Sequence, residues 1–553
     1  MKSFIKTACI VYLVSFCGCK KMLKEYNPSG LTDDVVYTTP AGFESLVNAS
    51  YTYLRSWYGK EPGINISEMG TDIWTSGSGE AYPDLTQYKN LQGINSALTN
   101  AWKQFYAGIN LCNAGLARID EAGLTPAIKT TRTAELKFLR AFYYWHIVET
   151  WGDVHFTVDQ TSGIVTEANK TPSAKFYEQI FADLNFAVSN LPSTTGDYGR
   201  ATKPAAEALL ARAYLTRAYT DASYFPLAVT HAKNVINNYN FSLMPNYADL
   251  WKMSNNVNSE VVWALNYSTV LAYNDLQDPV LFPGGDSRGS NNAHLLYTMK
   301  YDDQPGMYRD IQNGRPFNRY MPTLFLLNLF DETKDSRYEG SFETVFYCNQ
   351  PDASKRPAGM NVGDTAVYCS KYSIPLSVQS TKVYRTYDRD KTYNVNASAK
   401  DKLHYVSLKK FKDPTRPNIN EQQSSHDTWI FRLAEMYFII AEADVTLNTS
   451  EAAQYLNVIR TRAALPGQQA AMQISASDIT LDFVLDEKAR EFAGEQIRWF
   501  DLKRTGKLLS RIQAHNPDAA INIQPYHVVR PIPQSQIDAV TNKGEFTQNP
   551  GYQ

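Results

Sequence analysis

The sequence predicts a mainly α protein, a superhelix of tetratricopeptide-like helix hairpins that carries a large, irregular, loop-rich insertion. Apolar residues recur at helical spacing in the first and last parts of the chain, often between a proline and a glycine. Small residues about 12 positions apart, such as Ala441 and Ala453, let two consecutive helices approach closely. Between these parts, turn residues are dense and helical periodicity is scarce.

The chain begins with a secretory signal of the lipoprotein type, residues 1–18. Lys2 and Lys6 precede or flank a short apolar run, and Gly18 stands directly before Cys19, as in a bacterial lipobox. This run is shorter than the roughly 20 apolar residues that a membrane-spanning helix needs, and no later stretch is long enough either. We therefore expect Cys19 to carry the lipid that attaches the protein to a membrane. An ordinary signal peptide with an incidental cysteine is the alternative.

Residues 19–240 are predicted to form an N-terminal helical region. A polar tether leads to Thr39 and Pro40, which begin a first helix. Residues 61–95 are expected to be irregular, because glycine, serine and proline are frequent there. Further helices are predicted over residues 102–119, 131–151, 175–191, 204–219 and 225–239.

Residues 241–425 are predicted to form an irregular layer of the same domain, and residues 426–553 a C-terminal helical region. In the latter, Glu487, Glu491 and Glu495 recur every four residues on one helix face. Like charges at this spacing repel each other unless cations lie between them. Since Arg490 and Arg498 each stand three residues from one of these glutamates, we expect a structural ion-pair network.

The composition and the motifs argue against several classes of protein. The formal net charge is −2, whereas a nucleic-acid-binding protein would show a basic excess. The sequence has no phosphate-binding glycine loop and no histidine pair at metal-ligand spacing, so we expect neither a cofactor nor a metal. Residues 285–289 match G-x-S-x-G, but no helix pattern follows them, and a nucleophilic serine needs one. The chain is therefore predicted not to be an enzyme.

Three cysteines remain beyond the signal region. Cys112 lies in a predicted helix and is expected to be a small core residue. Cys348 and Cys369 lie in the loop-rich part of an exported chain, where a disulfide and two free thiols are both compatible with the sequence.

Several motifs, taken together and in this order, resemble the SusD/RagB family of nutrient-binding outer-membrane lipoproteins. Besides the lipobox, they are "AELKFLRAFYYWHIVETWGDVHF" (134–156), "ATKPAAEALLARAYL" (201–215), "RLAEMYFIIAEA" (432–443), "LNVIRTRA" (456–463), "EKAREFAGEQIRWFDLKRTGKL" (487–508) and the final "QNPGY". They span nearly the whole mature chain.

The resemblance implies a function. It implies a protein on the exterior of the outer membrane that binds oligosaccharides and delivers them, without catalysis, to a SusC-like TonB-dependent transporter. Residues 490–504, which belong to the signature, are expected to be structural. A surface glycoside hydrolase, a peptide-binding member of the family and an adaptor for other proteins remain alternatives. Which glycan is bound stays open.

The resemblance also suggests where the ligand binds. Residues 67–74 ("SEMGTDIW") resemble the place where glycan-stacking tryptophans occur in the family, so Trp74 is the leading candidate. An indole can stack on the apolar face of a sugar ring, and Asp72 could accept hydrogen bonds from its hydroxyls. The remaining candidates for the same patch are tyrosines: Tyr82, Tyr273, Tyr297 and Tyr301.

Overall fold

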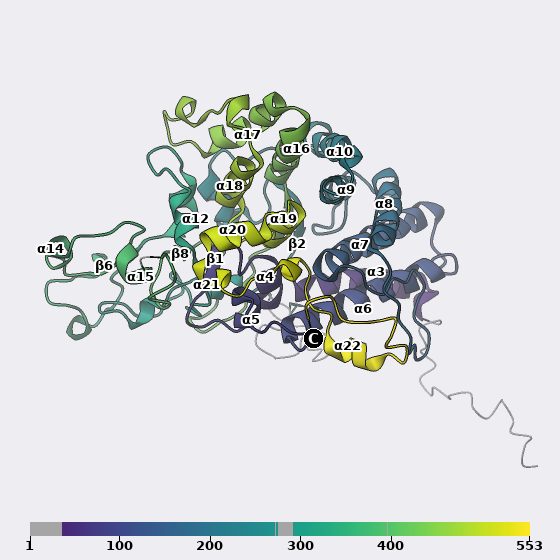
Figure 1. Cartoon of the computed structure of the whole chain (residues 1–553), viewed down its shortest axis with the longest axis horizontal. Coiled ribbons are helices and arrows are strands. Elements are labelled where there is room, and N and C mark those ends of the chain that lie inside the picture. Colours follow the sequence, from purple (N-terminus) through teal and green to yellow (C-terminus); the bar gives the residue numbers. More distant parts are fainter. Residues whose placement is uncertain (1–35, 271–272, 275–290, 395, 553) are drawn as a thin grey trace, which may run out of the picture.

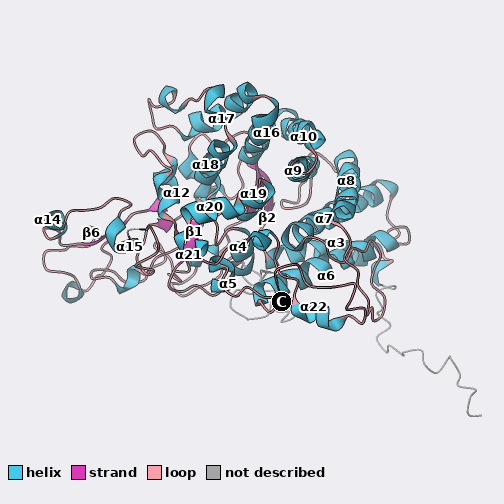
Figure 2. Cartoon of the chain, viewed as in Figure 1, coloured by secondary structure: helices cyan, strands magenta, loops and turns pink. Residues whose placement is uncertain are grey.

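A computed structural model describes residues 36–270, 273–274, 291–394 and 396–552. The predicted signal peptide, Cys19 and the G-x-S-x-G segment lie outside the described residues. Helices dominate the described part, with a few short strands between them (Figure 2). No helix in these ranges combines the length and the apolar character that crossing a bilayer requires.

Seven helices of the described chain pack one against the next around an arc (Figure 1). The helix α10 packs against α16, which follows it only after the whole loop-rich part of the chain, so one continuous superhelix includes both ends of the sequence. This arrangement confirms the predicted fold of stacked helix hairpins. The helices are α6 (Ser96–Arg118), α7 (Pro126–Trp151), α8 (Ser173–Asn190), α9 (Lys203–Ala218), α10 (Phe225–Asn238), α16 (Leu433–Leu447) and α17 (Thr449–Ala463).

Capping residues determine where these helices begin. The Thr125 side chain accepts from a backbone N–H in the first turn of α7, which starts with Pro126 and stops before Gly152. Asn95 caps α6 in the same way, 3.0 Å from the amide nitrogen of Leu98. Both helices therefore begin several residues earlier than predicted, because the predictions started from Trp102 and Thr131 and did not use these capping residues.

Small residues lie where the helix pairs meet, as predicted. Ala441 and Ala453 belong to one buried cluster at α16 and α17, and Ala211 and Ala228 are fully buried on α9 and α10. Cys112 is also completely buried, which confirms its assignment to the core.

Further short helices complete the frame. Residues 61–95, which we expected to be irregular, contain two of them, because residues 61–74 turn inward and bury their side chains. These helices are α3 (Pro40–Thr52), α4 (Glu61–Ser67), α5 (Pro83–Gln87), α18 (Leu481–Phe492), α19 (Arg498–Arg504), α20 (Leu508–His515), α21 (Pro517–Ala520) and α22 (Gln534–Ala539).

The loop-rich part packs around a second hydrophobic cluster, which it shares with Ile64, Trp74 and Ala489, and projects from the frame at α14, β6 and α15 (Figure 1). Antiparallel pairs join β1 (Trp74–Ser76) to β3 (Tyr320–Pro322), β2 (Val261–Leu265) to β9 (Thr428–Arg432), and β4 (Phe342–Glu343) to β8 (Ser407–Leu408). A three-stranded sheet contains β5 (Val345–Tyr347), β6 (Thr365–Cys369) and β7 (Arg385–Tyr387). The short helices here are α11 (Ala293–Leu296), α12 (Leu324–Asn328), α13 (Arg337–Ser341), α14 (Leu376–Gln379) and α15 (Arg389–Thr392).

The register of β5 and β6 decides between the two possibilities for the cysteines. Cys348 N–H donates to Asp364 at one end of the ladder, and Cys369 N–H donates to Thr344 at the other end. The two thiols are therefore too far apart for a disulfide, and both are free and buried.

A row of three carboxylates on α18 and the turn after it joins the frame to the loop-rich layer. Glu487 and Glu491 are fully buried, and the Glu495 side chain is 9% exposed. Arg498 pairs with Asp72 and not with a glutamate of the row, so that part of the expectation is wrong. The network itself and the role of Arg490 are confirmed, with cations from both parts of the chain. They are Arg337, Lys410, Arg432, Arg460, Arg462 and Arg490.

Two guanidinium groups make this network continuous. Arg337 Nη2 lies 2.6 Å from Glu487 Oε1, and its Nη1 lies 3.2 Å from Glu491 Oε2. Arg432 Nη1 lies 2.9 Å from Glu491 Oε1, and its Nε lies 2.7 Å from Glu495 Oε2. Since Arg337 begins α13 and Arg432 ends β9, the carboxylate row fixes segments that are far apart in the sequence.

We expect Glu491→Gln to lower the free energy of unfolding by about 3–5 kcal/mol, because its arginine partners lose a buried counter-charge. Burial opposes ionisation of this carboxyl, yet Arg462, Arg432 and Arg337 hold its pKa at about 2. Urea unfolding followed by circular dichroism measures the loss.

Glu178→Gln is the matched control. Glu178 is 66% exposed, and its partner Lys175 is 57% exposed at 2.6 Å, so the change should stay below about 1 kcal/mol. Equal losses in the two variants would show that the buried row is not a structural centre.

Candidate functional site

The segment predicted to contact the ligand, residues 67–74, lies in the core. Trp74 is completely buried, with its Nε1 donating to Glu68 Oε1 at 2.9 Å and its ring edge-on to Tyr297. Asp72 is also completely buried and accepts from Arg498 Nη2 at 2.6 Å and from Arg511 Nε at 2.7 Å. A sugar cannot reach either side chain here, so the prediction of direct ligand contact is wrong for both.

Glu68 shows why this segment is buried. Its carboxylate accepts the backbone N–H groups of Gly494 (2.9 Å), Ile497 (3.2 Å) and Arg498 (3.2 Å), at the start of α19. Gly494 has a φ of +86°, and a Cβ there would lie 2.6 Å from the side chain of Leu408. Burial raises the pKa of Glu68 to about 7, although the hydrogen bonds from these N–H groups lower it. Residues 67–74 and 490–504 therefore form one structural unit.

The four candidate tyrosines are divided between core and surface. Tyr297 and Tyr301 are buried, the latter stacked on Phe346 with centroids 5.3 Å apart, so direct contact is wrong for them too. Tyr82 is half-buried at the start of α5, and Tyr273 is 75% exposed. Both remain predictions. Tyr273 lines a cavity that none of the other candidates lines, so the structure does not assemble the expected single patch.

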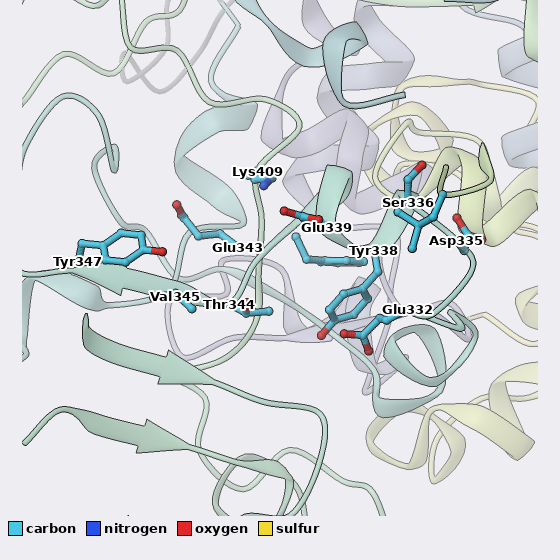
Figure 3. Close-up of a pocket in the computed structure, with 12 residues that line it drawn as sticks. Glu332, Asp335, Ser336, Tyr338, Glu339, Glu343, Thr344, Val345, Tyr347 and Lys409 are labelled. Atoms are coloured by element: carbon cyan, nitrogen blue, oxygen red, sulfur yellow. The ribbon is translucent and has the colours of Figure 1, made fainter. Parts of the chain in front are cut away.

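A cavity of about 430 Å³ opens where the layer meets the frame (Figure 3). The segment from Glu332 to Tyr347 forms most of its wall, and Lys409 and Leu465 complete it. Figure 3 shows Tyr347 on the side opposite Asp335 and Ser336. The carboxylate row positions this wall, because Arg337 of α13 binds both Glu487 and Glu491.

Several hydrogen-bonding groups in the cavity have no partner among the residues that the structure describes. Tyr338 is only 5% exposed, and no described residue hydrogen-bonds its hydroxyl. Glu339 and Lys409 likewise have no ion-pair partner in the described parts of the chain. Tyr347 adds a ring that is 58% exposed. An acceptor, a cationic donor and two phenol groups are thus available to a ligand.

The other acidic groups of the cavity are occupied. Glu332 pairs with Lys371 Nζ at 2.7 Å, Asp335 pairs with Arg337, and Glu343 pairs with Lys412. A glycosidase needs one carboxylic acid and one carboxylate free to face the same bond. These carboxylates are arranged as ion pairs, so the geometry suits the binding of a polyhydroxylated ligand better than its hydrolysis.

Sequence reasoning did not identify this cavity. The sequence feature that could have pointed to the cavity is the run "RYEGSFETVFY" (337–347), in which acidic and aromatic residues lie close together. Lys409 reaches the same place only because β4 pairs with β8, with Phe342 opposite Leu408.

Comparison with known proteins gives the family. The sequence family described as "SusD family" matches residues 259–552, more than half of the chain. The chain belongs to the SusD family. A second description, "Starch-binding associating with outer membrane", matches residues 25–215. The resemblance inferred from the motifs is thereby confirmed.

Relatives match along nearly the whole chain. SusD-like protein P25 of Formosa agariphila is 25% identical over 98% of both chains, and the starch-binding protein SusD of Bacteroides thetaiotaomicron is 22% identical over 88% of this chain and 85% of its own. Among solved structures, a laminarin binding SusD-like protein matches with a TM-score of 0.68 at 20% identity, covering 93% of this chain and 100% of that one.

Surface glycan-binding protein A from Bacteroides thetaiotaomicron, in complex with laminarihexaose, matches with a TM-score of 0.69 at 21% identity. The match covers 92% of this chain and 99% of that one. These structural matches establish that the chain has the SusD fold.

The Asp72 cluster makes stability depend on pH. Burial opposes its ionisation, but Arg498 and Arg511 lower the pKa of Asp72 to about 2, below the unfolded value of about 3.9. Ionised Asp72 contributes about 2–3 kcal/mol to the free energy of unfolding. This contribution is complete above roughly pH 4 and disappears as the pH falls through about 2.

We therefore expect Asp72→Asn to be less stable than the wild type at about pH 7, with a gap that narrows by about pH 2.5. Unfolding free energies of both proteins across this range test it, since subtraction cancels the other carboxyl groups. A gap that is independent of pH would contradict the assignment.

Proposed function

We propose that this chain is a lipid-anchored outer-membrane protein that binds oligosaccharides outside the cell and passes them to a SusC-like TonB-dependent transporter. It cleaves no glycosidic bond itself. The observation that carries the proposal is the cavity of Figure 3, in a chain of the SusD family, with Tyr338, Glu339 and Lys409 unpartnered among the described residues.

The chemistry of the cavity fits a sugar. The C–H face of a pyranose can lie on the exposed ring of Tyr347, while its hydroxyls donate to Glu339 and accept from Lys409. Cavities of this size hold small ligands. The relatives named above as laminarin-binding, glycan-binding and starch-binding support the ligand class, and the description of the residue 25–215 match supports the outer membrane as the location.

The transporter follows from the family resemblance. A protein that holds an oligosaccharide at the surface without cleaving it needs a second protein that moves the ligand inward. Attachment through Cys19 would let the body lie over such a transporter while the lipid stays in the membrane.

We expect Tyr347→Ala to weaken oligosaccharide binding about two- to twelve-fold, because loss of an aromatic contact costs about 0.5–1.5 kcal/mol. A glycan array identifies the ligand, and calorimetric titration gives the affinities. Tyr308→Ala is the control, since Tyr308 is 42% exposed but does not line the cavity.

Three outcomes would contradict parts of this proposal. Unchanged affinity in Tyr347→Ala removes the cavity as the site, and product release from a bound glycan removes the non-catalytic role. Binding of peptides but of no glycan changes the ligand class.

We expect Cys19→Ser to abolish lipid labelling and to release the protein from the membrane fraction, because the acyl chains provide the attachment. Cys17→Ser, a change in the same stretch, should leave both unchanged. Fatty-acid labelling followed by fractionation tests this, and a Cys19→Ser protein that stays labelled would disprove the anchor.

A further inference from the structure

A second cavity of about 430 Å³ lies on the helical frame. Its walls come from α3, from the turn after it, from the loop around Gly199 and from the end of β2. Tyr273 and Tyr198 contribute aromatic rings, and Arg55 contributes a guanidinium group. None of the residues that line the cavity of Figure 3 lines this one.

Arg55 is the unusual group of this second cavity. It is half-buried, its Nη2 donates to the backbone oxygen of Asn266 at 3.3 Å, and its guanidinium carbon lies 5.4 Å from the ring centroid of Tyr267. No carboxylate of the described chain lies within ion-pair distance of it. Among the described residues, Arg55 uses only one of its guanidinium N–H groups in a hydrogen bond.

The neighbouring arginine shows the contrast. Arg200 lines the same cavity, but Glu44, Glu135 and Asp197 accept from its guanidinium at 2.5, 2.9 and 3.2 Å. Arg200 is therefore neutralised by the protein, whereas the charge of Arg55 is left for a ligand. Asp427, which binds the N–H of Tyr267 at 2.7 Å, does not pair with Arg55.

The two tyrosines provide surfaces beside this charge. Tyr198 is 38% exposed, and its hydroxyl donates to Asn256 O at 3.3 Å, which fixes the ring. Tyr273 is 75% exposed, and its N–H donates to Val270 O at 2.9 Å. The side chain of the next residue, Asn274, donates to the backbone oxygen of Ser268 at 2.7 Å and accepts from the backbone N–H of Ser268 at 2.8 Å. The Tyr198 ring is thus fixed through its hydroxyl, and the backbone that carries Tyr273 is fixed by a turn.

From this arrangement we propose that the second cavity binds an acidic unit of an oligosaccharide, with a carboxylate or sulfate on Arg55 and sugar rings on Tyr198 and Tyr273. The inference rests on the proposed function and narrows its ligand class to acidic glycans. A planar guanidinium can donate two parallel hydrogen bonds to such a group, which gives orientation as well as charge.

The two cavities then differ in the part of the ligand that they recognise. In the cavity of Figure 3, three carboxylates are neutralised by ion pairs, and among the described residues the unpaired Glu339 is accompanied by the unpaired Lys409, so its free groups carry no net charge and suit neutral hydroxyls. The second cavity supplies an uncompensated cation. One ligand with neutral and acidic units, or two different ligands, could use both.

The test uses the mature protein and an array of neutral, uronate-containing and sulfated oligosaccharides. Each acidic oligosaccharide that binds is then titrated together with its carboxyl-reduced or desulfated counterpart, which distinguishes the two anions. We expect the counterpart to bind about ten-fold or more weakly, and Arg55→Gln to lose the same factor for the acidic form only. The affinity of the wild type should also fall with added salt, and that of Arg55→Gln should fall less.

Two further variants separate charge from folding. Arg385→Gln, on an exposed arginine of β7 outside both cavities, should bind like the wild type. Arg55→Lys keeps the charge without the planar fork and should bind with intermediate affinity.

The outcomes separate this inference from the function on which it rests. Binding of neutral glycans alone, sensitive to Tyr347→Ala, would overturn the acidic ligand and leave the proposed function standing. Acidic glycans that bind Arg55→Gln as tightly as the wild type would also overturn it. Binding of acidic peptides but of no glycan would overturn both.

Discussion

The buried carboxylate row of α18 is the interaction on which the arrangement of this protein depends. Three glutamates one helical turn apart would repel each other, and burying them would be costly, unless cations filled the space between them. Arg337 comes from the layer, Arg432 from the end of β9, and Arg462 from α17. Pairing these charges restricts how the three segments can lie relative to one another. The row therefore acts less as a source of net stability than as a restriction on how the layer can lie on the helices.

The same principle explains the position of residues 67–74. Glu68 and Asp72 stand four residues apart and face the signature segment, where one binds backbone amides and the other binds two arginines. Trp74 completes this junction by donating to Glu68. A tryptophan next to two acidic residues can bind a sugar at the surface or join helices in the core. In this structure Trp74 is buried and joins two segments of the core.

This ambiguity sets the limit of what the sequence could predict. The long helices, the small residues between them and the ion pair of Glu487 with Arg490 follow from local spacing, and the structure has them. The cavity of Figure 3 does not follow, because Tyr338 and Lys409 meet only through a two-residue strand pair that no local pattern encodes. For the same reason Cys348 and Cys369 looked compatible with a disulfide, although the register of β5 and β6 separates them. Exposure depends on contacts between distant segments, so the sequence misplaced Trp74 on the surface and also missed the short helices α4 and α5 on either side of it.

In the proposed function, two cavities of one frame would serve different parts of a ligand or different ligands. A single aromatic contact or charged hydrogen bond contributes little, so affinity depends on how little must be ordered when the ligand binds. Tyr338 is held under a network of buried ions, and Tyr198 is tied to Asn256. Because the buried ion pairs of Arg337 fix the backbone next to Tyr338, the exposed Glu339 beside it could change without disturbing the fold. The choice of ligand is thereby separated from the stability of the frame, which is what a binding protein with variable ligands requires.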